Sequence, residues 1–288
     1  MFQGGLSVTI NGGTGDDSIE NTGSYSIING NAGNDSIQNS FGDSVIIDCG
    51  SGNDSIYNLS GNDVSIIGGT GDDTIYNSNS SNVSISGGSG NDYVWNGSEN
   101  VKIEGENGDD TIETQGKSVT VSSGAGNDSI YNYSEDFSVN SGIGDDTIQN
   151  RGINAMLIGD AGNDFIENTE GNNVLINGGS GNDTIDNIGS NVTISAGYGN
   201  DSICNFDDNV SIDAGEGNDF VSNGLKITDN AINTSNYVFI NGGDGDDVII
   251  NEVRYQGVSY GGNSVTINGG KGNDLIEIAS SAKDNLIF

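Results

Sequence analysis

A short segment rich in glycine and aspartate recurs through the chain and constrains the fold more than any other feature. Its first copy lies within VTINGGTGDDSIEN, from Val8 to Asn21. Each copy reads small residue, Gly, any residue, Gly, Asn or Asp, Asp, any residue, Ile or Val, and we number these positions 1 to 8. The aspartates at position 6 are Asp17, Asp35, Asp54, Asp73, Asp92, Asp110, Asp128, Asp146, Asp164, Asp183, Asp201, Asp219, Asp247 and Asp274. The first eleven gaps between them are 18 or 19 residues and the last two are 28 and 27, which predicts a solenoid with one copy in each turn.

Position 4 is glycine in every copy. These glycines are Gly15, Gly33, Gly52, Gly71, Gly90, Gly108, Gly126, Gly144, Gly162, Gly181, Gly199, Gly217, Gly245 and Gly272. Glycine is required where φ is positive or where another backbone approaches closely, so this column predicts a tight bend stacked on identical bends. Position 2 is less strict, because Asn31, Glu106 and Asp160 replace glycine there.

The residues between the bends alternate with period two. Each bend is followed by one apolar residue and usually an asparagine, as in Ile56 and Asn58, and later by an apolar pair such as Val83 and Ile85. Such alternation predicts short strands with one inward face, and about three apolar residues per turn suffice for a narrow core. The fold class is therefore all-β, a parallel β-helix or β-roll of about 14 coils of 18–19 residues. The asparagines are expected to form a ladder of stacked side-chain amides.

No shift in composition marks a domain boundary, so we expect a single solenoid over residues 1–288. Two insertions of about ten residues break the period late in the chain, at about 224–235 and 252–262. Insertions of this kind are either loops that bind a partner or solvated excursions, and the residues favour neither.

The charge balance narrows the function. The chain has 42 acidic and seven basic residues, a net charge of -35, and no histidine. Such a composition favours disorder unless cations or a basic partner compensate the charge, and it disfavours nucleic acid and anionic membranes as partners. The sequence shows neither a signal peptide nor a membrane span. Without histidine there is no Ser-His or Cys-His dyad, so we expect no enzyme, and a polysaccharide-modifying β-helix enzyme is the weakest alternative.

The bends resemble a known repeat. GGTGDDTIY (Gly68 to Tyr76) and GGSGNDTID (Gly178 to Asp186) are similar to the nonapeptide of RTX proteins, the hemolysin-type calcium-binding repeat. The resemblance implies that the position-6 carboxylate and the carbonyls of positions 2 and 4 bind Ca²⁺, which also prefers oxygen ligands on chemical grounds. The implied ligands are the aspartates and position-4 glycines given above, with the position-2 glycines Gly13, Gly50, Gly69, Gly88, Gly124, Gly142, Gly179, Gly197, Gly215, Gly243 and Gly270.

Fourteen turns leave thirteen gaps, so we expect roughly thirteen calcium ions. The other half of each coil, such as residues 77–86, lacks both the glycines and the aspartate. The chain thus resembles a one-sided variant of the RTX solenoid, with calcium along one edge only.

The function that this resemblance implies is a calcium-binding structural module of a secreted bacterial exoprotein or adhesin. RTX proteins generally use a type I route without a leader, and the module is expected to fold on calcium binding outside the cell.

Three alternatives stay open. An ice-binding segment would need a flat, regular row of threonines or similar residues at position 3. The residues there are not regular, since the first four are Thr14, Ala32, Ser51 and Thr70. A carbohydrate-binding adhesin segment is suggested by the column of Tyr57, Tyr76 and Trp95, with Tyr131 two coils further, although simple cross-strand stacking explains it as well. A self-assembling extracellular filament would associate through the solenoid ends.

Overall fold

The computed structural model describes residues 8–228, 231–255, 258–279 and 284–288, and over these ranges it is all-β. None of the described residues belongs to a helix that is long and apolar enough to cross a membrane. The chain divides into two compact units, Met1–Gly142 and Ile143–Phe288.

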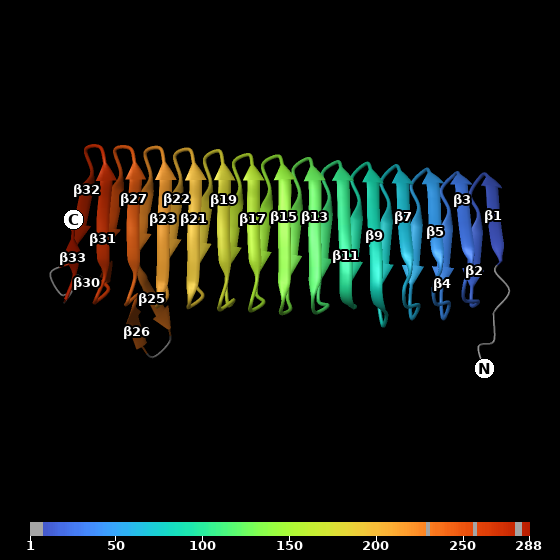
Figure 1. Cartoon of the computed structure of the whole chain (residues 1–288), viewed down its shortest axis with the longest axis horizontal. Helices are drawn as coiled ribbons and strands as arrows, with labels where there is room; N and C mark the ends of the chain where they lie inside the picture. The colour runs from blue at the N-terminus through green and yellow to red at the C-terminus, as the bar shows by residue number, and fades with distance from the viewer. Residues whose placement is uncertain (1–7, 229–230, 256–257, 280–283) are drawn as a thin grey trace. The chain divides into compact units, whose positions relative to one another are not determined.

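In the first unit each turn contributes one strand to each of two parallel sheets (Figure 1, blue to green). The first sheet contains β1 (Thr9–Thr14), β3 (Ile27–Ala32), β5 (Ile46–Ser51), β7 (Ser65–Thr70), β9 (Ser81–Ser89), β11 (Glu99–Asn107) and β13 (Val119–Ala125). The second contains β2 (Ser18–Asn21), β4 (Ser36–Asn39), β6 (Ser55–Asn58), β8 (Thr74–Asn77), β10 (Tyr93–Asn96), β12 (Thr111–Thr114) and β14 (Ser129–Asn132). Strand β15 (Phe137–Ile143) lies at the end of this unit.

The second unit repeats the arrangement. One sheet contains β17 (Met156–Ala161), β19 (Leu175–Ser180), β21 (Val192–Tyr198), β23 (Val210–Glu216), β27 (Phe239–Asp244), β31 (Thr266–Lys271) and β33 (Leu286–Ile287). The other contains β16 (Thr147–Asn150), β18 (Phe165–Asn168), β20 (Thr184–Asn187), β22 (Ser202–Asn205), β24 (Phe220–Asn223), β28 (Val248–Asn251) and β32 (Leu275–Ile278). The predicted class, a parallel β-solenoid of about fourteen turns, is confirmed.

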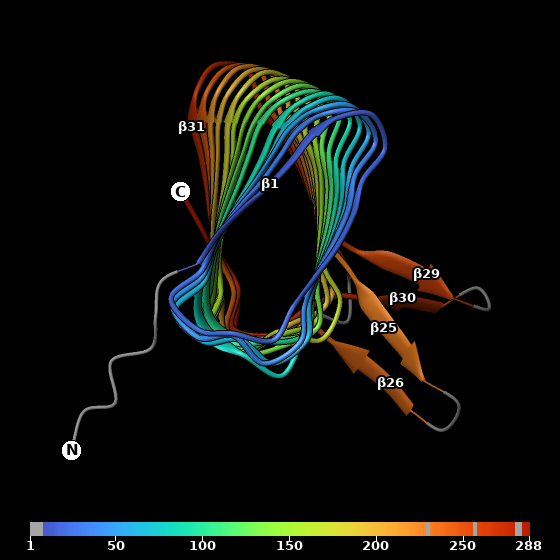
Figure 2. The same ribbon diagram turned by 90° about the vertical axis from the view of Figure 1, so that its right-hand side faces the viewer.

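Both late insertions form antiparallel hairpins in the second unit. Strand β25 (Leu225–Thr228) pairs with β26 (Ala231–Thr234), and β29 (Val253–Tyr255) pairs with β30 (Val258–Tyr260). They leave neighbouring turns at the same corner, since the Asn223 side chain donates a 2.9 Å hydrogen bond to Asn251 immediately before them. Figure 2 shows both hairpins projecting from the same side of these turns.

The interior of each turn is narrow and apolar. In a typical turn the inward side chains are Ile56 from the second sheet and Val64 and Ile66 at the start of the next strand of the first, all at most 2% exposed. The neighbours of these residues, such as Ser55, Ser65 and Ile67, are more exposed, so the predicted period-two alternation with about three core residues per turn is confirmed.

The predicted asparagine ladder is also present. Asn39 donates its side-chain amide to the Oδ1 of Asn58 at 2.9 Å, and Asn58 donates to Asn77 at 2.8 Å, all three being fully buried. Asn39 and Asn58 also donate to a carbonyl of their own corner, Gly42 and Gly61 respectively. The ladder thus ties each turn to the next and holds the corner at the same time.

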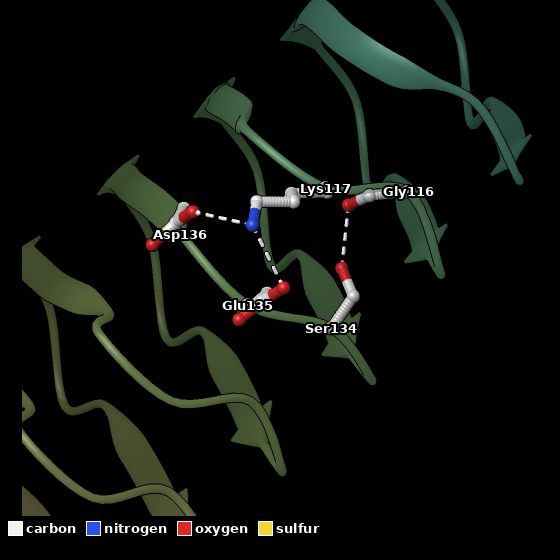
Figure 3. Close-up of polar contacts among 5 residues, drawn as sticks. All are labelled: Gly116, Lys117, Ser134, Glu135 and Asp136. Atoms are coloured by element: carbon white, nitrogen blue, oxygen red, sulfur yellow. Dashed lines mark hydrogen bonds and ion pairs between the residues drawn. The ribbon is translucent and has the colours of Figure 1, made fainter.

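Threonine replaces asparagine once in the first unit. Asn96 donates to the Thr114 hydroxyl at a longer 3.3 Å. At the same corner, the Lys117 ammonium contacts Glu135 at 2.8 Å and Asp136 at 3.4 Å in the following turn (Figure 3). The Ser134 hydroxyl donates to the Gly116 carbonyl beside them. These surface contacts therefore join the turn that carries Thr114 to the turn that follows it.

One further corner residue in each turn adopts a left-handed conformation, which sequence reasoning did not identify. It immediately precedes the buried residue at the start of the core pair, as Asn82 precedes Val83, and its φ lies near 57°. Asn, Asp or Ser fills most of these positions, in keeping with their tolerance of this region. Tyr25 and Tyr237 are the exceptions, with φ of 60° and 56°.

The aromatic column lies on one outer face, as predicted. The Tyr57 and Tyr76 rings stack with centroids 5.3 Å apart and planes within 2°, and Trp95 follows Tyr76 at 6.4 Å. Glu113 occupies the next register position and separates Trp95 from Tyr131. The Tyr57 and Tyr76 rings stack on each other, so cross-strand stacking accounts for this column.

Replacing a ladder asparagine tests the ladder's share of stability. Asn58→Ala leaves the Gly61 carbonyl without its side-chain donor and the Asn39 amide without its Asn58 acceptor in a buried corner, which should lower the free energy of unfolding by about 2 kcal/mol. Asn29→Ala is the matched control, because it removes a 2.7 Å amide pair with Asn11 on the exposed face. Urea denaturation of the calcium-loaded proteins measures both, and equal losses would contradict a larger contribution from the buried ladder than from the exposed pair.

Candidate metal centre

The position-6 aspartates lie at the bend between the two sheets. Strand β7 ends at Thr70 and β8 begins at Thr74, so Asp73 immediately precedes the second strand of its turn. In the turns between the ends of the chain these side chains are only 1–2% exposed. A row of carboxylates therefore lies inside the protein along one edge.

From Asp35 onward, one oxygen of most of these carboxylates accepts a backbone hydrogen bond. Asp73 Oδ1 accepts the amide N–H of Asp54 at 2.8 Å, and Asp92 Oδ1 accepts that of Asp73 at the same distance. Each aspartate thus binds the corresponding residue of the preceding turn, which fixes the rotamer of the carboxylate.

Position 5 forms a second ladder that runs the opposite way. Asn53 Oδ1 accepts the amide N–H of Asp72 at 3.0 Å, and Asp72 Oδ1 accepts that of Asn91 at 2.8 Å. Both Asn and Asp carry an Oδ1 acceptor, so either residue type fits. This hydrogen bond was not predicted from the sequence.

The second carboxylate oxygen, Oδ2, is buried and accepts no hydrogen bond. This holds among the described residues for Asp17, Asp35, Asp54, Asp73, Asp92, Asp110, Asp164, Asp183, Asp201, Asp219 and Asp247. An unpartnered buried carboxylate oxygen carries a large desolvation penalty, and repeating it turn after turn multiplies that penalty. The row calls for a compensating positive charge.

The surroundings of Oδ2 consist of further oxygens. A Cβ atom added to Gly68, at position 1, would stand 2.4 Å from Asp73 Oδ2 and 2.5 Å from the Gly87 carbonyl oxygen of the next turn. Gly178 repeats this with Asp183 and the Ala196 carbonyl at 2.3 and 2.6 Å. The space beside position 1 is therefore an oxygen-lined cradle, which suits a hard cation.

Position 1 was not among the predicted ligands, although a small residue was noted there. The glycine or small residue is required because a larger side chain would fill the cradle. Cys49, Ser123, Ser141, Ala196 and Ala214 occupy it in some turns. Among these, Ser123 forms a hydrogen bond with the Asp128 carboxylate.

Positions 2 and 4 bring the backbones of successive turns close together. A Cβ on Gly71 would stand 2.1 Å from the Gly52 carbonyl oxygen, and one on Gly69 would stand 2.1 Å from that of Gly50. The predicted carbonyl ligands thus face the neighbouring turn. Asn31, Glu106 and Asp160 at position 2 adopt φ of 75–80°, a region that glycine enters more easily.

Burial raises the pKa of several position-6 aspartates. Desolvation, which the amide hydrogen bond partly offsets and neighbouring carboxylates reinforce, raises the pKa of Asp73 and Asp110 to about 7. The pKa of Asp164 and Asp201 also rises to about 7, and that of Asp92 and Asp219 to about 6. These carboxyl groups resist ionisation near neutral pH unless a cation compensates their charge.

The donor set selects among metals. The described residues contain no group of three or more His, Cys, Asp or Glu side chains that would hold a metal by side chains alone. A cation at this edge would be bound by one carboxylate per turn together with backbone carbonyls, an all-oxygen set. Such a set fits Ca²⁺ and does not fit Zn²⁺, which favours nitrogen and sulfur.

Comparison with known families agrees with this chemistry. The RTX calcium-binding nonapeptide repeat matches residues 8–21, 22–46, 42–64, 65–76, 77–103, 104–134, 156–175, 238–251 and 260–277. The chain belongs to the RTX calcium-binding repeat family. No curated protein matches the sequence of this RTX chain.

Solved structures share the architecture of this RTX chain. A hyperactive, Ca²⁺-dependent, β-helical antifreeze protein from an Antarctic bacterium has a TM-score of 0.51 at 19% identity, covering 94% of this chain and 78% of that one. At this identity the likeness shows the fold alone. A PL6 alginate lyase complexed with a trisaccharide (TM-score 0.28, 12% identity, 98% and 78% covered) carries no functional argument. Nor does a GH87 α-1,3-glucanase from Streptomyces thermodiastaticus (TM-score 0.30, 10% identity, 97% and 62% covered).

The raised pKa values predict a pH dependence with opposite signs in chelator and in calcium. A carboxyl whose pKa rises on folding stabilises the fold below its unfolded pKa of about 4, and this stability is lost as the pH rises through about 6 to 7. In chelator, acidification from about pH 8 to about pH 5 should therefore increase β structure. With calcium present, the same acidification should raise the calcium midpoint, because protons compete for the carboxylates.

Far-UV circular dichroism across this range measures both effects. Spectra and calcium midpoints that do not change between about pH 8 and about pH 5 would contradict the assignment of these carboxyls as the titrating groups.

Proposed function

We propose that this chain is a calcium-folded structural module in which a row of Ca²⁺ ions along one edge joins successive turns. The observation that carries the proposal is the row of buried aspartate Oδ2 atoms without hydrogen-bond partners. Each ion neutralises charge that the fold otherwise buries at high cost, and this supplies the stabilisation that a narrow core lacks.

The ligands that we propose are the position-6 carboxylates and the carbonyls of positions 2 and 4, for example Asp73 with Gly69 and Gly71. The position-1 carbonyl of the next turn, such as that of Gly87, is a further candidate because it lies beside the same cradle. With one ion between each pair of turns, the chain would hold roughly thirteen ions.

The cellular setting follows from the dependence on calcium. RTX repeats are typical of secreted bacterial proteins, and the net charge of -35 keeps the calcium-free chain from compacting. A chain that stays unfolded where calcium is scarce and folds where it is plentiful suits export followed by folding outside the cell. We propose that it forms part of a secreted exoprotein or surface adhesin and has no catalytic role of its own.

Ice binding is less well supported. The outward position 3 of the bends carries bulky and charged side chains among small ones, such as Tyr198, 62% exposed, and Glu216. A regular flat rank of hydroxyls is therefore interrupted on this edge.

A calcium titration tests the proposal. In chelator at about pH 8 the chain should give a disordered far-UV circular dichroism spectrum, because the buried carboxylates repel one another and remain unsatisfied. Added calcium should produce cooperative β structure, while magnesium at equal concentration should be a poor substitute because it demands a stricter octahedral shell. Light scattering recorded in parallel separates folding from assembly. A full β spectrum in excess chelator at this pH would falsify the proposal.

A further inference from the structure

A hollow lies on the outer surface of the second unit, beside the left-handed corner residues of three successive turns. Its volume is about 470 Å³, and its exposed lining consists of Asn191, Thr193, Asn209, Ser211, Tyr237 and Phe239. Each turn contributes the corner residue and the residue two positions later. The register places Thr193 beside Ser211 and Ser211 beside Phe239.

Two aromatic side chains bound this hollow on one side. Tyr237 is 67% exposed and Phe239 is 45% exposed, and they lie two residues apart on the same face. Tyr237 holds a left-handed φ of 56°, which costs a bulky residue more than the Asn at the same corner in neighbouring turns. The fold gains no core burial from either ring, so their exposure points to a use at the surface.

The floor of the hollow is polar and unpaired. Within the described part of the chain, no hydrogen bond involves the side chains of Asn191, Thr193, Asn209 or Ser211. This differs from the same corner elsewhere, where Asn82 donates to Asp63 at 3.1 Å and Asn173 donates to Asn154 at 3.3 Å. Two amides and two hydroxyls are thus available as both donors and acceptors.

This combination selects a class of ligand. Sugar rings present an apolar C–H face and a rim of hydroxyl groups, which match an aromatic wall and a floor of amides and hydroxyls respectively. Asp213 lies two residues beyond Ser211 on β23, and the chain as a whole carries a charge of -35, so anionic sugars would be repelled. The ligand that fits is uncharged.

We infer that this hollow binds a neutral saccharide, with the Tyr237 and Phe239 rings against a sugar face and the side chains of Asn191, Thr193, Asn209 and Ser211 bonded to its hydroxyl groups. The inference goes beyond the calcium module, because none of these residues belongs to the bends. It also places saccharide binding away from the column of Tyr57, Tyr76 and Trp95, in which two tyrosine rings stack on each other.

Saturation-transfer NMR on the calcium-loaded full chain tests the inference. The probes are the neutral glucose tetramers cellotetraose, laminaritetraose and maltotetraose, with a mannuronate tetramer as the acidic comparison. At least one neutral tetramer should receive saturation and the acidic one should not. The double variant Tyr237→Asn with Phe239→Thr should weaken this binding about tenfold or more, since it removes the aromatic wall while keeping residue types native to this corner and strand.

The matched control is Tyr25→Asn, because Tyr25 occupies the same corner in the first unit with φ of 60° and 54% exposure. It should leave binding unchanged. Thr193→Val is a second test variant that keeps the strand-forming shape and removes one hydroxyl, and it should weaken binding several-fold. Circular dichroism at saturating calcium confirms folding in each sample, so loss of the calcium-dependent fold is distinguishable from loss of the saccharide site.

Three outcomes overturn the inference. They are saturation of no neutral tetramer by the folded wild-type chain, equal saturation of the acidic tetramer, and binding that survives in the folded Tyr237→Asn, Phe239→Thr variant.

Discussion

Most described turns of this protein contain a buried carboxylate with one oxygen that accepts a backbone hydrogen bond and one oxygen without a partner, as at Asp54, Asp92 and Asp164. The rest of the structure depends on how that second oxygen is satisfied. Asp73 shows the arrangement: its Oδ1 accepts an amide of the preceding turn, and its Oδ2 faces a cradle lined by the Gly87 carbonyl. The first contact fixes where the second oxygen lies. We propose that calcium in that cradle offsets the cost of burying this charge and thereby ties successive turns together.

The remaining elements hold the turns in a register that keeps these oxygens aligned. The buried asparagine ladder joins turns at the opposite corner, as between Asn58 and Asn77, and the narrow core of residues such as Ile56 and Ile66 sets the width of the coil. The left-handed corner residues, such as Asn82, adopt a positive φ without being glycine. Each of these interactions recurs in successive turns and joins only adjacent turns, so a change in one turn affects mainly its neighbours.

Much of this architecture could be predicted from sequence, because in a solenoid residues that are one repeat apart in sequence lie at equivalent positions of successive turns. The fixed spacing of the aspartates gave one bend per turn, the glycines at position 4 indicated close backbone approach, and the asparagines after each strand indicated an amide ladder. Each of these signals lies in the identity and spacing of a single residue type.

Features that depend on side-chain direction could not be predicted in this way. The position-5 ladder runs opposite to the aspartate ladder, and no spacing reveals that Asn53 accepts from the following turn. The proximity of position 1 to Oδ2 arises from the fold of the bend, although its restriction to small residues was a visible signal. The hollow beside Tyr237 could not be predicted, because it is formed by three turns that flank an insertion, and the repeat does not specify the conformation of that insertion.

The central claim is that a cation satisfies Oδ2, and the variant Asp73→Asn tests it most directly. Asparagine keeps the Oδ1 acceptor for the Asp54 amide and replaces only the charged Oδ2. Asp72→Asn is the control, since its Oδ1 ladder is kept and its second oxygen is exposed. In a calcium titration followed by circular dichroism, Asp73→Asn should require more calcium to fold, yet retain more β structure than the wild type in chelator. A variant that folds more readily than the wild type at every calcium concentration would show that the charge is merely buried, and would contradict a calcium ion at this oxygen.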